Sequence, residues 1–146
     1  MMSFEQKINN LYESITCAKL DPEVGIRITH LTDNEHISSY AAEINPHKKI
    51  RAHYHKSGIE IYQVIEGEGV IYTGKSDVNR NISWSPPLNL KKGDCITVHE
   101  GNIHQLFNNS DERLIVIFVC PSSHMGEDRI IVKGIEINIG DIYENL

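Results

Sequence analysis

The clearest pattern along the chain is a series of short apolar segments separated by polar turns. Residues 24–31 and 37–44 read as strands, and residues 114–119 are apolar on both faces, as a fully buried strand would be. Shorter runs predict further strands at 60–65, 70–73, 96–98, 103–107, 129–132 and 135–139. Many short strands with turn residues between them indicate an all-β sandwich or barrel.

Two segments depart from the strand pattern. Apolar residues recur at helical spacing over residues 3–17 and predict a helix there. Ser3 and Gln6 form a capping box at its start. Residues 74–92 are polar and are expected to form a long connection. No repeat or second domain is visible in the sequence. We therefore expect a helical segment, residues 1–20, that packs on a single β-domain, residues 21–146.

The composition is that of one globular domain. Of the 146 residues, 40% are hydrophobic and 23% are charged. The net charge of −6 argues against nucleic-acid binding, which needs a basic surface. No apolar run reaches the length of a membrane span, and the N-terminus lacks the apolar core of a signal peptide, so we expect a cytoplasmic protein. The three widely spaced cysteines indicate no disulfide framework and are expected to be small buried hydrophobes.

Three histidines and a glutamate are the strongest candidates for chemistry. His53 and His55 are two residues apart and therefore share one face of a strand. A turn at residues 56–58 leads to Glu60 at the start of the next apolar run, and His104 comes from a third run. Three imidazoles and a carboxylate suit a divalent transition metal, although a His-x-His pair taken alone is more often two surface residues.

The spacing of these residues resembles the two sequence motifs of the cupin superfamily. The matching residues are His53, His55, Glu60 and Gly67 in the first motif, and Gly93, Gly101, His104 and Asn108 in the second. The chain departs from the family pattern at His47, where the family has Gly, and at His99, where it has Pro. Both departures fall at turn positions that supply no metal ligand, and the resemblance covers residues 47–108.

The resemblance implies a fold and a site. It implies an all-β fold consisting of a single cupin-type, jelly-roll-like antiparallel β-barrel, here with a short N-terminal helix. It also implies a metal at the open end of the barrel, and the ligands would be His53, His55, Glu60 and His104. Iron, manganese, nickel and zinc are all compatible with such ligands. A homodimer is a further expectation from the family, and the apolar face of the N-terminal helix can contribute to it.

Strand alternation places further residues beside the expected metal. Arg51 shares the face of His53, so its guanidinium can hold a carboxylate or phosphate of the substrate; the alternative is a solvated arginine at the strand end. Tyr62 shares the face of Glu60 and either donates a hydrogen bond to the substrate or fills the barrel. His99 lies at a turn and is expected to face away. The remaining histidines are expected at the surface: His30, His36, His47 and His124.

The expected site favours a reaction on an anion. Four protein ligands leave two positions open on a six-coordinate ion, and Glu60 neutralises only part of a divalent charge. We therefore expect a metal-dependent enzyme that acts on a small anionic metabolite, and the resemblance to cupins implies a reaction of the oxygenase or sugar-phosphate isomerase type. The alternatives are a non-catalytic small-molecule-binding domain of the cupin type and a storage or scaffold protein, and the fold does not choose among them.

Overall fold

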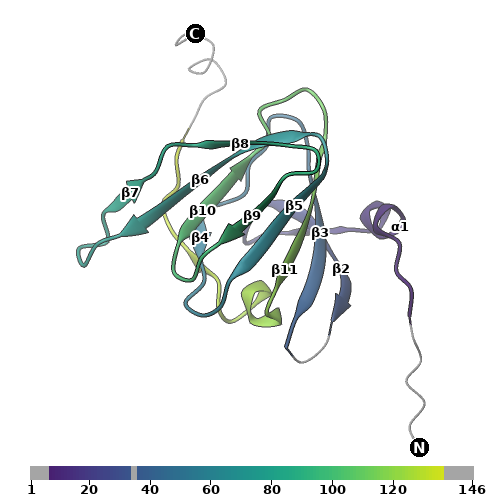
Figure 1. Cartoon of the computed structure of the whole chain (residues 1–146), viewed down its shortest axis with the longest axis horizontal. Helices are drawn as coiled ribbons and strands as arrows, with labels where there is room; N and C mark the ends of the chain where they lie inside the picture. Colours follow the sequence, from purple (N-terminus) through teal and green to yellow (C-terminus); the bar gives the residue numbers. More distant parts are fainter. Residues whose placement is uncertain (1–6, 34–35, 137–146) are drawn as a thin grey trace, which may run out of the picture.

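Two antiparallel sheets packed face to face dominate the structure, a computed structural model that describes residues 7–33 and 36–136 (Figure 1). The first sheet has the order β1-β2-β3-β11-β5-β9, formed by Lys19–Asp21, Ile26–Asp33, Ser38–Ile44, Leu114–Cys120, Glu60–Glu66 and Cys95–Val98. The second has the order β12-β4-β10-β6-β7, with β8 also paired to β6, formed by Ile130–Ile131, His53–Tyr54, Ile103–Phe107, Glu68–Ser76, Ile82–Trp84 and Leu88–Lys91. A short helix, α1 (Leu11–Thr16), and a 3-10 turn, η1 (Ser122–Met125), complete the described elements.

The chain crosses between the two sheets repeatedly. From β3 to β6, and again from β9 to β12, each successive strand joins the other sheet. This winding is the jelly-roll arrangement, and among the described strands the sheets stay separate instead of closing into one hydrogen-bonded ring. The predicted all-β, jelly-roll-like fold with a short helix near the N-terminus is therefore confirmed. The crossing also carries His53 and Glu60 onto facing sheets.

The core lies between the facing sheets. On β5, Glu60, Tyr62 and Val64 are buried while the residues between them are more exposed, which is the period of two expected of a strand. Ile71 and Leu106 of the second sheet belong to the same apolar cluster as Tyr62 and Val64. Glu60 is thus the polar end of an otherwise apolar inward-facing row.

The helix is shorter than the sequence pattern predicted. It spans Leu11–Thr16, because Asn10 has an extended backbone and its side chain accepts hydrogen bonds from two N–H groups of the first turn. The helix prediction is therefore wrong for residues 7–10, and the capping box of Ser3 and Gln6 lies outside the described residues. No helix in the described part of the chain has the length and apolar character needed to cross a bilayer.

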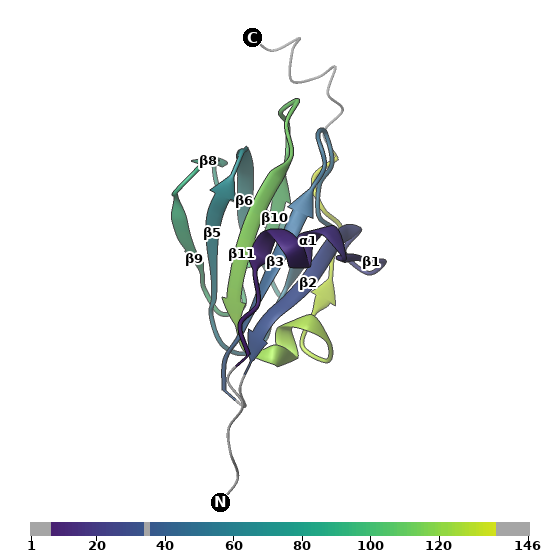
Figure 2. The same cartoon turned by 90° about the vertical axis from the view of Figure 1, so that its right-hand side faces the viewer.

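The helix covers the outer face of the first sheet (Figure 2). Ile15 packs with Ala41 and Ile115 in a small apolar cluster that is separate from the main core. The guanidinium of Arg27 donates to the carbonyl oxygens of Ile15 and Ala18, and so satisfies groups that the end of the helix leaves open. Leu11 of the helix packs against the same cluster, so apolar contacts and the guanidinium of Arg27 together hold the helix.

The polar connection predicted for residues 74–92 is largely a strand region. Strand β6 continues to Ser76, and β7 and β8 both pair with it. The carboxylate of Asp77 accepts the N–H groups of Asn79 and Asn81 and closes the turn before β7. These strands escaped the sequence reasoning because most of their residues are exposed and carry little apolar periodicity. Figure 1 shows this hairpin extending beyond the rest of the sheet.

Two smaller expectations also need correction. Of the last predicted strands, β12 covers Ile130–Ile131, whereas residues 135–136 lie outside any strand and residues 137–139 lie outside the described residues. Cys120 is buried, and burial raises the pKa of its thiol, but Cys17 and Cys95 are exposed. The expectation of three buried cysteines is therefore wrong for two of them.

Candidate metal centre

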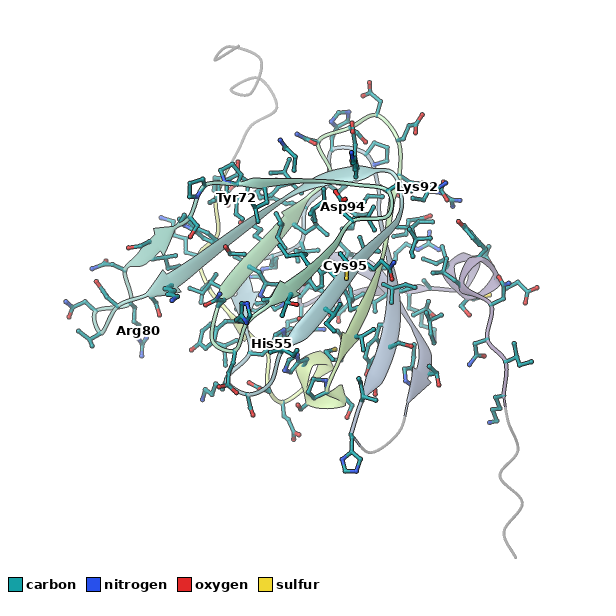
Figure 3. All side chains as sticks on the ribbon, in the orientation of Figure 1. His55, Tyr72, Arg80, Lys92, Asp94 and Cys95 are labelled. Atoms are coloured by element: carbon teal, nitrogen blue, oxygen red, sulfur yellow. The ribbon has the colours of Figure 1, made fainter. Side chains whose placement is uncertain are left out.

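The four predicted ligands come together between the sheets. His53 of β4 is directly opposite His104 in the ladder with β10, His55 follows β4, and Glu60 begins β5 on the facing sheet. One ligand atom from each residue lies within 4.8 Å of the other three, and all four side chains are buried. The convergence that the sequence predicted is therefore present. Figure 3 places His55 close to η1, far from the turn that carries Lys92 and Asp94.

Each of the three imidazoles is oriented by a backbone carbonyl. The Nδ1 atom of His53 lies 2.8 Å from the oxygen of Arg51, that of His55 lies 2.5 Å from the oxygen of Asp128, and that of His104 lies 3.1 Å from the oxygen of Asn102. A carbonyl oxygen only accepts, so each Nδ1 carries a proton, and in the neutral ring the lone pair is then on Nε2. This is the tautomer in which an imidazole binds a metal through Nε2.

Three atoms at the centre lack hydrogen-bond partners in the described part of the chain. The Nε2 atoms of His55 and His104 lie 2.9 and 3.5 Å from Oε2 of Glu60, but none of these three buried atoms makes a hydrogen bond of acceptable geometry. A buried polar atom without a partner costs about 1–3 kcal/mol. Two lone pairs and a carboxylate oxygen that face one another are satisfied together by one cation, so the donor set fits a divalent metal.

The charges of the side chains suit the same purpose. Burial acts to raise the pKa of the Glu60 carboxyl, but imidazoles of His104 and His55 that carry a proton on Nε2 donate to it and hold its pKa well below its ordinary value; a bound cation takes the place of those protons. Burial, with the neighbouring His104, lowers the pKa of His53 well below its ordinary value. Glu60 is therefore an anion and His53 a neutral base near pH 7, which are the forms that bind a metal.

Asp128 supports the loop that carries His55. Besides the contact of its carbonyl with the imidazole, its carboxylate accepts the N–H groups of Lys56 and Ser57 at 2.7 and 3.1 Å. Burial acts to raise the pKa of this carboxyl, but the two N–H groups keep it below its ordinary value. The N–H of Gly101, a motif glycine with a φ of 75°, donates to the carbonyl of His55. The position of His55 is therefore fixed from three sides.

His124 is a buried neighbour of the centre, so its expected surface position is wrong. Its ring stacks on His55 with centroids 3.9 Å apart, and its Nε2 lies 2.6 Å from the carbonyl oxygen of Ser57. Its Nδ1 has no hydrogen-bond partner within residues 7–33 and 36–136, and it lies 3.9 Å from Oε2 of Glu60. Burial lowers the pKa of His124, so this nitrogen faces the centre as an acceptor. A lone histidine after a buried strand carries no pattern that identifies it.

Arg129 is the second residue that the sequence reasoning missed. Its side chain is 3% exposed, and with His53, Glu60 and Tyr62 it lines a cavity beside the centre. The cavity is small, about 10 Å³, which is room for about one water molecule. A cation buried beside the candidate metal centre is itself a candidate for ligand binding. Arg129 reaches this position because η1 and the residues after it fold back over the end of the sheets.

The two predicted substrate contacts lie in different surroundings. Arg51 is exposed, and its guanidinium donates to the carbonyl of Glu23 at 3.4 Å. Tyr62 is 1% exposed and lines the cavity; burial, with Glu60 next, raises the pKa of its phenol well above the ordinary value. Their roles in substrate binding stay predictions. His30, His36, His47 and His99 are exposed, as expected.

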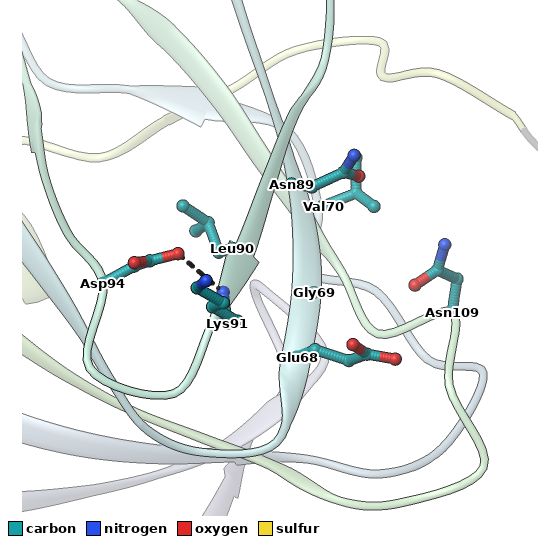
Figure 4. Close-up of a pocket in the computed structure, with 8 residues that line it drawn as sticks. All are labelled: Glu68, Gly69, Val70, Asn89, Leu90, Lys91, Asp94 and Asn109. Atoms are coloured by element: carbon teal, nitrogen blue, oxygen red, sulfur yellow. Dashed lines mark hydrogen bonds between the residues drawn. The ribbon is translucent and has the colours of Figure 1, made fainter.

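A second hollow lies at the other end of the sheets, where β6 begins (Figure 4). It is open to solvent and lined by residues that include Glu68, Leu90, Lys91 and Asp94. The carboxylate of Asp94 already accepts the N–H of Lys91, so it serves the turn. The groove offers no convergent set of metal-binding atoms comparable to that of the histidine cluster.

Comparisons with known proteins agree with the fold. A family model described as "Cupin domain" matches residues 41–120, which is more than half of the chain. An uncharacterized conserved protein with a double-stranded β-helix domain from Klebsiella pneumoniae superposes with a TM-score of 0.66 at 18% identity, over 89% of this chain and 100% of that chain. A Cupin 2 conserved barrel domain protein from Salinispora arenicola superposes with a TM-score of 0.62 at 17% identity, over 84% of this chain and 93% of that chain.

Further comparisons add no closer guide to activity. A predicted oxalate decarboxylase from Thermotoga maritima superposes with a TM-score of 0.53 at 20% identity, over 73% of this chain and 81% of that chain. At such identities the likeness concerns the fold alone. No curated protein matches the sequence significantly.

Proposed function

Because the chain belongs to the cupin family, we propose that it is a metal-dependent enzyme acting on a small anionic metabolite. The metal would be a divalent transition ion such as iron, manganese, nickel or zinc, and its ligands would be His53, His55, Glu60 and His104. The observation that carries the proposal is the orientation of the imidazoles. Three Nδ1 atoms contact backbone carbonyls, which leaves three Nε2 lone pairs beside one ionised carboxylate.

The charge of the centre supports an anionic substrate. A divalent ion and the single charge of Glu60 leave one net positive charge in a buried site, where electrostatic attraction is weakly screened. When bound, the ion supplies Lewis acidity or, if it is iron, oxygen activation. The residues of the chain hold it, exclude water and keep the substrate near it. The reaction would be of the oxygenase or sugar-phosphate isomerase type.

The narrow cavity favours a second candidate, a small-molecule-binding domain without turnover. A space of about 10 Å³ accommodates little beyond one water-sized group, so a larger substrate requires movement of the residues that cover the centre. A tightly closed site is suited to holding a very small ligand. The two candidates share the metal centre and differ in whether a bound ligand is converted.

Metal content tests the centre itself. We expect purified, metal-loaded protein to hold one equivalent per chain by elemental analysis, and His55→Ala and His104→Ala to lose it. His99→Ala is the matched control, because His99 is an exposed histidine that lies outside the cluster. Equal metal content in wild type and His55→Ala would refute the assignment.

Turnover separates the two candidate functions. Oxygen consumption by the iron-loaded protein with a panel of small acids favours the oxygenase, and interconversion of sugar phosphates followed by NMR favours the isomerase. Ligand binding by calorimetry without conversion in either assay favours the binding domain. His104→Ala should remove every one of these signals if the metal centre is responsible.

Homodimerisation and a cytoplasmic location stay predictions from the sequence. Ile15 of the helix packs against the chain's own sheet, while Ile8 and Tyr12 are exposed near it. Sedimentation at micromolar concentration checks the expected dimer, and a monomer there would contradict it.

A further inference from the structure

Arg129 is a buried cation whose surroundings satisfy only part of its guanidinium. Its Nη1 donates to Oδ2 of Asp21 at 2.8 Å and lies 3.8 Å from Oε1 of Glu23. Among the residues that the structure describes, its Nη2 contacts only the thioether sulfur of Met125, at 3.1 Å, and its Nε has no hydrogen-bond partner. A buried charged group with open donors is costly, so the open donors mark a place where another group is accommodated.

The open donors form one edge of the guanidinium. Asp21 occupies the Nη1 end. This leaves Nε and Nη2, whose N–H bonds lie in the plane of the guanidinium and run parallel along one edge. Two parallel N–H donors match the two oxygens of a carboxylate and bind it bidentately. The thioether of Met125 is a weak acceptor on a flexible chain, so an anion can replace it at small cost.

We infer that the Nε–Nη2 edge of Arg129 binds the carboxylate of a small ligand that occupies the proposed metal centre. The inference rests on the proposed function, because it assigns the ligand of the same centre. Arg129, His53 and Glu60 line one cavity of about 10 Å³, so a ligand that touches both the metal and the arginine is short. The cavity itself has room for about one water molecule, so the ligand enters only by displacing the side chain of Met125, which also lines the cavity, and its class is limited to carboxylic acids of a few carbon atoms.

The assignment also distinguishes two arginines that approach the same segment. Arg51 is exposed and contacts the carbonyl of Glu23, whereas Arg129 is buried and contacts the carboxylates of Asp21 and Glu23. Burial strengthens the pairing of a guanidinium with an anion, because solvent screens it less. The buried arginine is thus the stronger anchor, although Arg51 was the one predicted from strand alternation.

The inference is tested by the binding of acetate, glycolate and malonate to zinc-loaded protein by calorimetry, each compared with its neutral amide. We expect wild type to bind at least one of these acids more tightly than its amide. Arg129→Gln should weaken that acid by about 10- to 100-fold, as the loss of a charge-assisted bidentate pair implies, and should leave the amide nearly unchanged. Arg80→Gln is the charge-matched control, because Arg80 lies at the far turn of the β6–β7 hairpin (Figure 3).

Failure of the role of Arg129 and failure of the metal centre would give different results. Unchanged acid binding in Arg129→Gln overturns the inference, as does a loss confined to Arg51→Gln, which would instead support the prediction from the sequence. Wild type that holds zinc but binds none of the three acids also overturns it. Wild type that holds no zinc contradicts the proposed metal centre, and the metal content of every sample is measured for this reason.

A second variant guards against misfolding. Arg129→Gln leaves Asp21 without its partner, whereas the double variant Asp21→Asn with Arg129→Gln restores neutrality. We expect the double variant to melt near the wild-type temperature, to hold zinc and to show the same loss of acid binding. Arg129→Lys keeps the charge without the two parallel donors and should bind the acid with intermediate affinity. A folded, zinc-loaded double variant with wild-type acid affinity would reject the role of Arg129.

Discussion

His53 of β4 and His104 of β10 are opposite residues of one antiparallel ladder, and the centroids of their rings are 4.3 Å apart. The backbone pairing therefore sets the separation of two of the four proposed ligands. Glu60 belongs to the facing sheet, so its distance from these histidines depends on how closely the sheets pack. The centre is consequently sensitive to any change that separates the two sheets.

Two motif glycines should differ in their tolerance of a side chain. Gly67 and Gly93 both have positive φ values, of 83° and 93°. A Cβ on Gly67 would clash with the carbonyl oxygen of Arg113, whereas one on Gly93 meets nothing within 4 Å. We expect Gly93→Ala to lower the free energy of unfolding by about 1–2 kcal/mol through backbone strain alone, and Gly67→Ala to lower it by more. Urea denaturation measures both, and equal losses would contradict the assigned clash.

The metal-free protein should lose stability in mild acid. The folded-state pKa of His53 is lowered, so as the pH falls through the ordinary histidine value of about 6.5 the unfolded chain takes up a proton first. Stability is therefore complete above that value and declines below it until His53 also titrates in the folded state. His124, whose pKa burial also lowers, contributes with the same sign. The melting temperature should fall less steeply with falling pH in His53→Gln than in wild type. An equally steep fall in the variant would show that His53 is not the source of the acid sensitivity.

Removal of the Asp128 carboxylate should loosen the metal without abolishing its binding. Asp128→Ala frees the N–H groups of Lys56 and Ser57 but retains the carbonyl that orients His55. Loss of a residue that holds a metal ligand in position typically weakens metal binding by about 10- to 100-fold. Competition with a chromophoric chelator measures the change, and Glu127→Ala, at an exposed neighbouring position, is the control. If both variants bind metal as wild type does, the carboxylate has no positioning role.

The docking of the helix should affect stability and leave the metal centre intact. Ile15 is 2% exposed against Ala41 and Ile115, so Ile15→Ala should cost about 2–5 kcal/mol. Ile8, which is 96% exposed, supplies the matched control, and its change to alanine should have no measurable effect. Denaturation followed by fluorescence and elemental analysis of the folded variants check the two statements. Metal loss from a folded Ile15→Ala protein would show that the outer face of the sheet also supports the centre.

The four proposed ligands were accessible from sequence because their spacing matches the two family motifs. The motif spacing brought His53, His55, Glu60 and His104 together without coordinates, although His55 follows β4 and strand alternation therefore does not place it in the structure. Reasoning from local patterns identified the strands whose apolar positions recur regularly. It was less successful for α1, where Asn10 rather than an earlier residue caps the helix, and for β7 and β8, whose side chains are mostly exposed.

Tertiary structure alone decided what surrounds the centre. Residues 121–129 fold back beneath the sheets, and this places His124 against His55 and Arg129 beside Glu60 although no periodic pattern marks either residue. Arg51 illustrates the opposite case, since β4 is only two residues long and the strand alternation that assigned it an inward face does not reach it. Spacing within a strand is determined by backbone geometry, whereas the return of a distant loop is determined by packing, which no short stretch of sequence encodes.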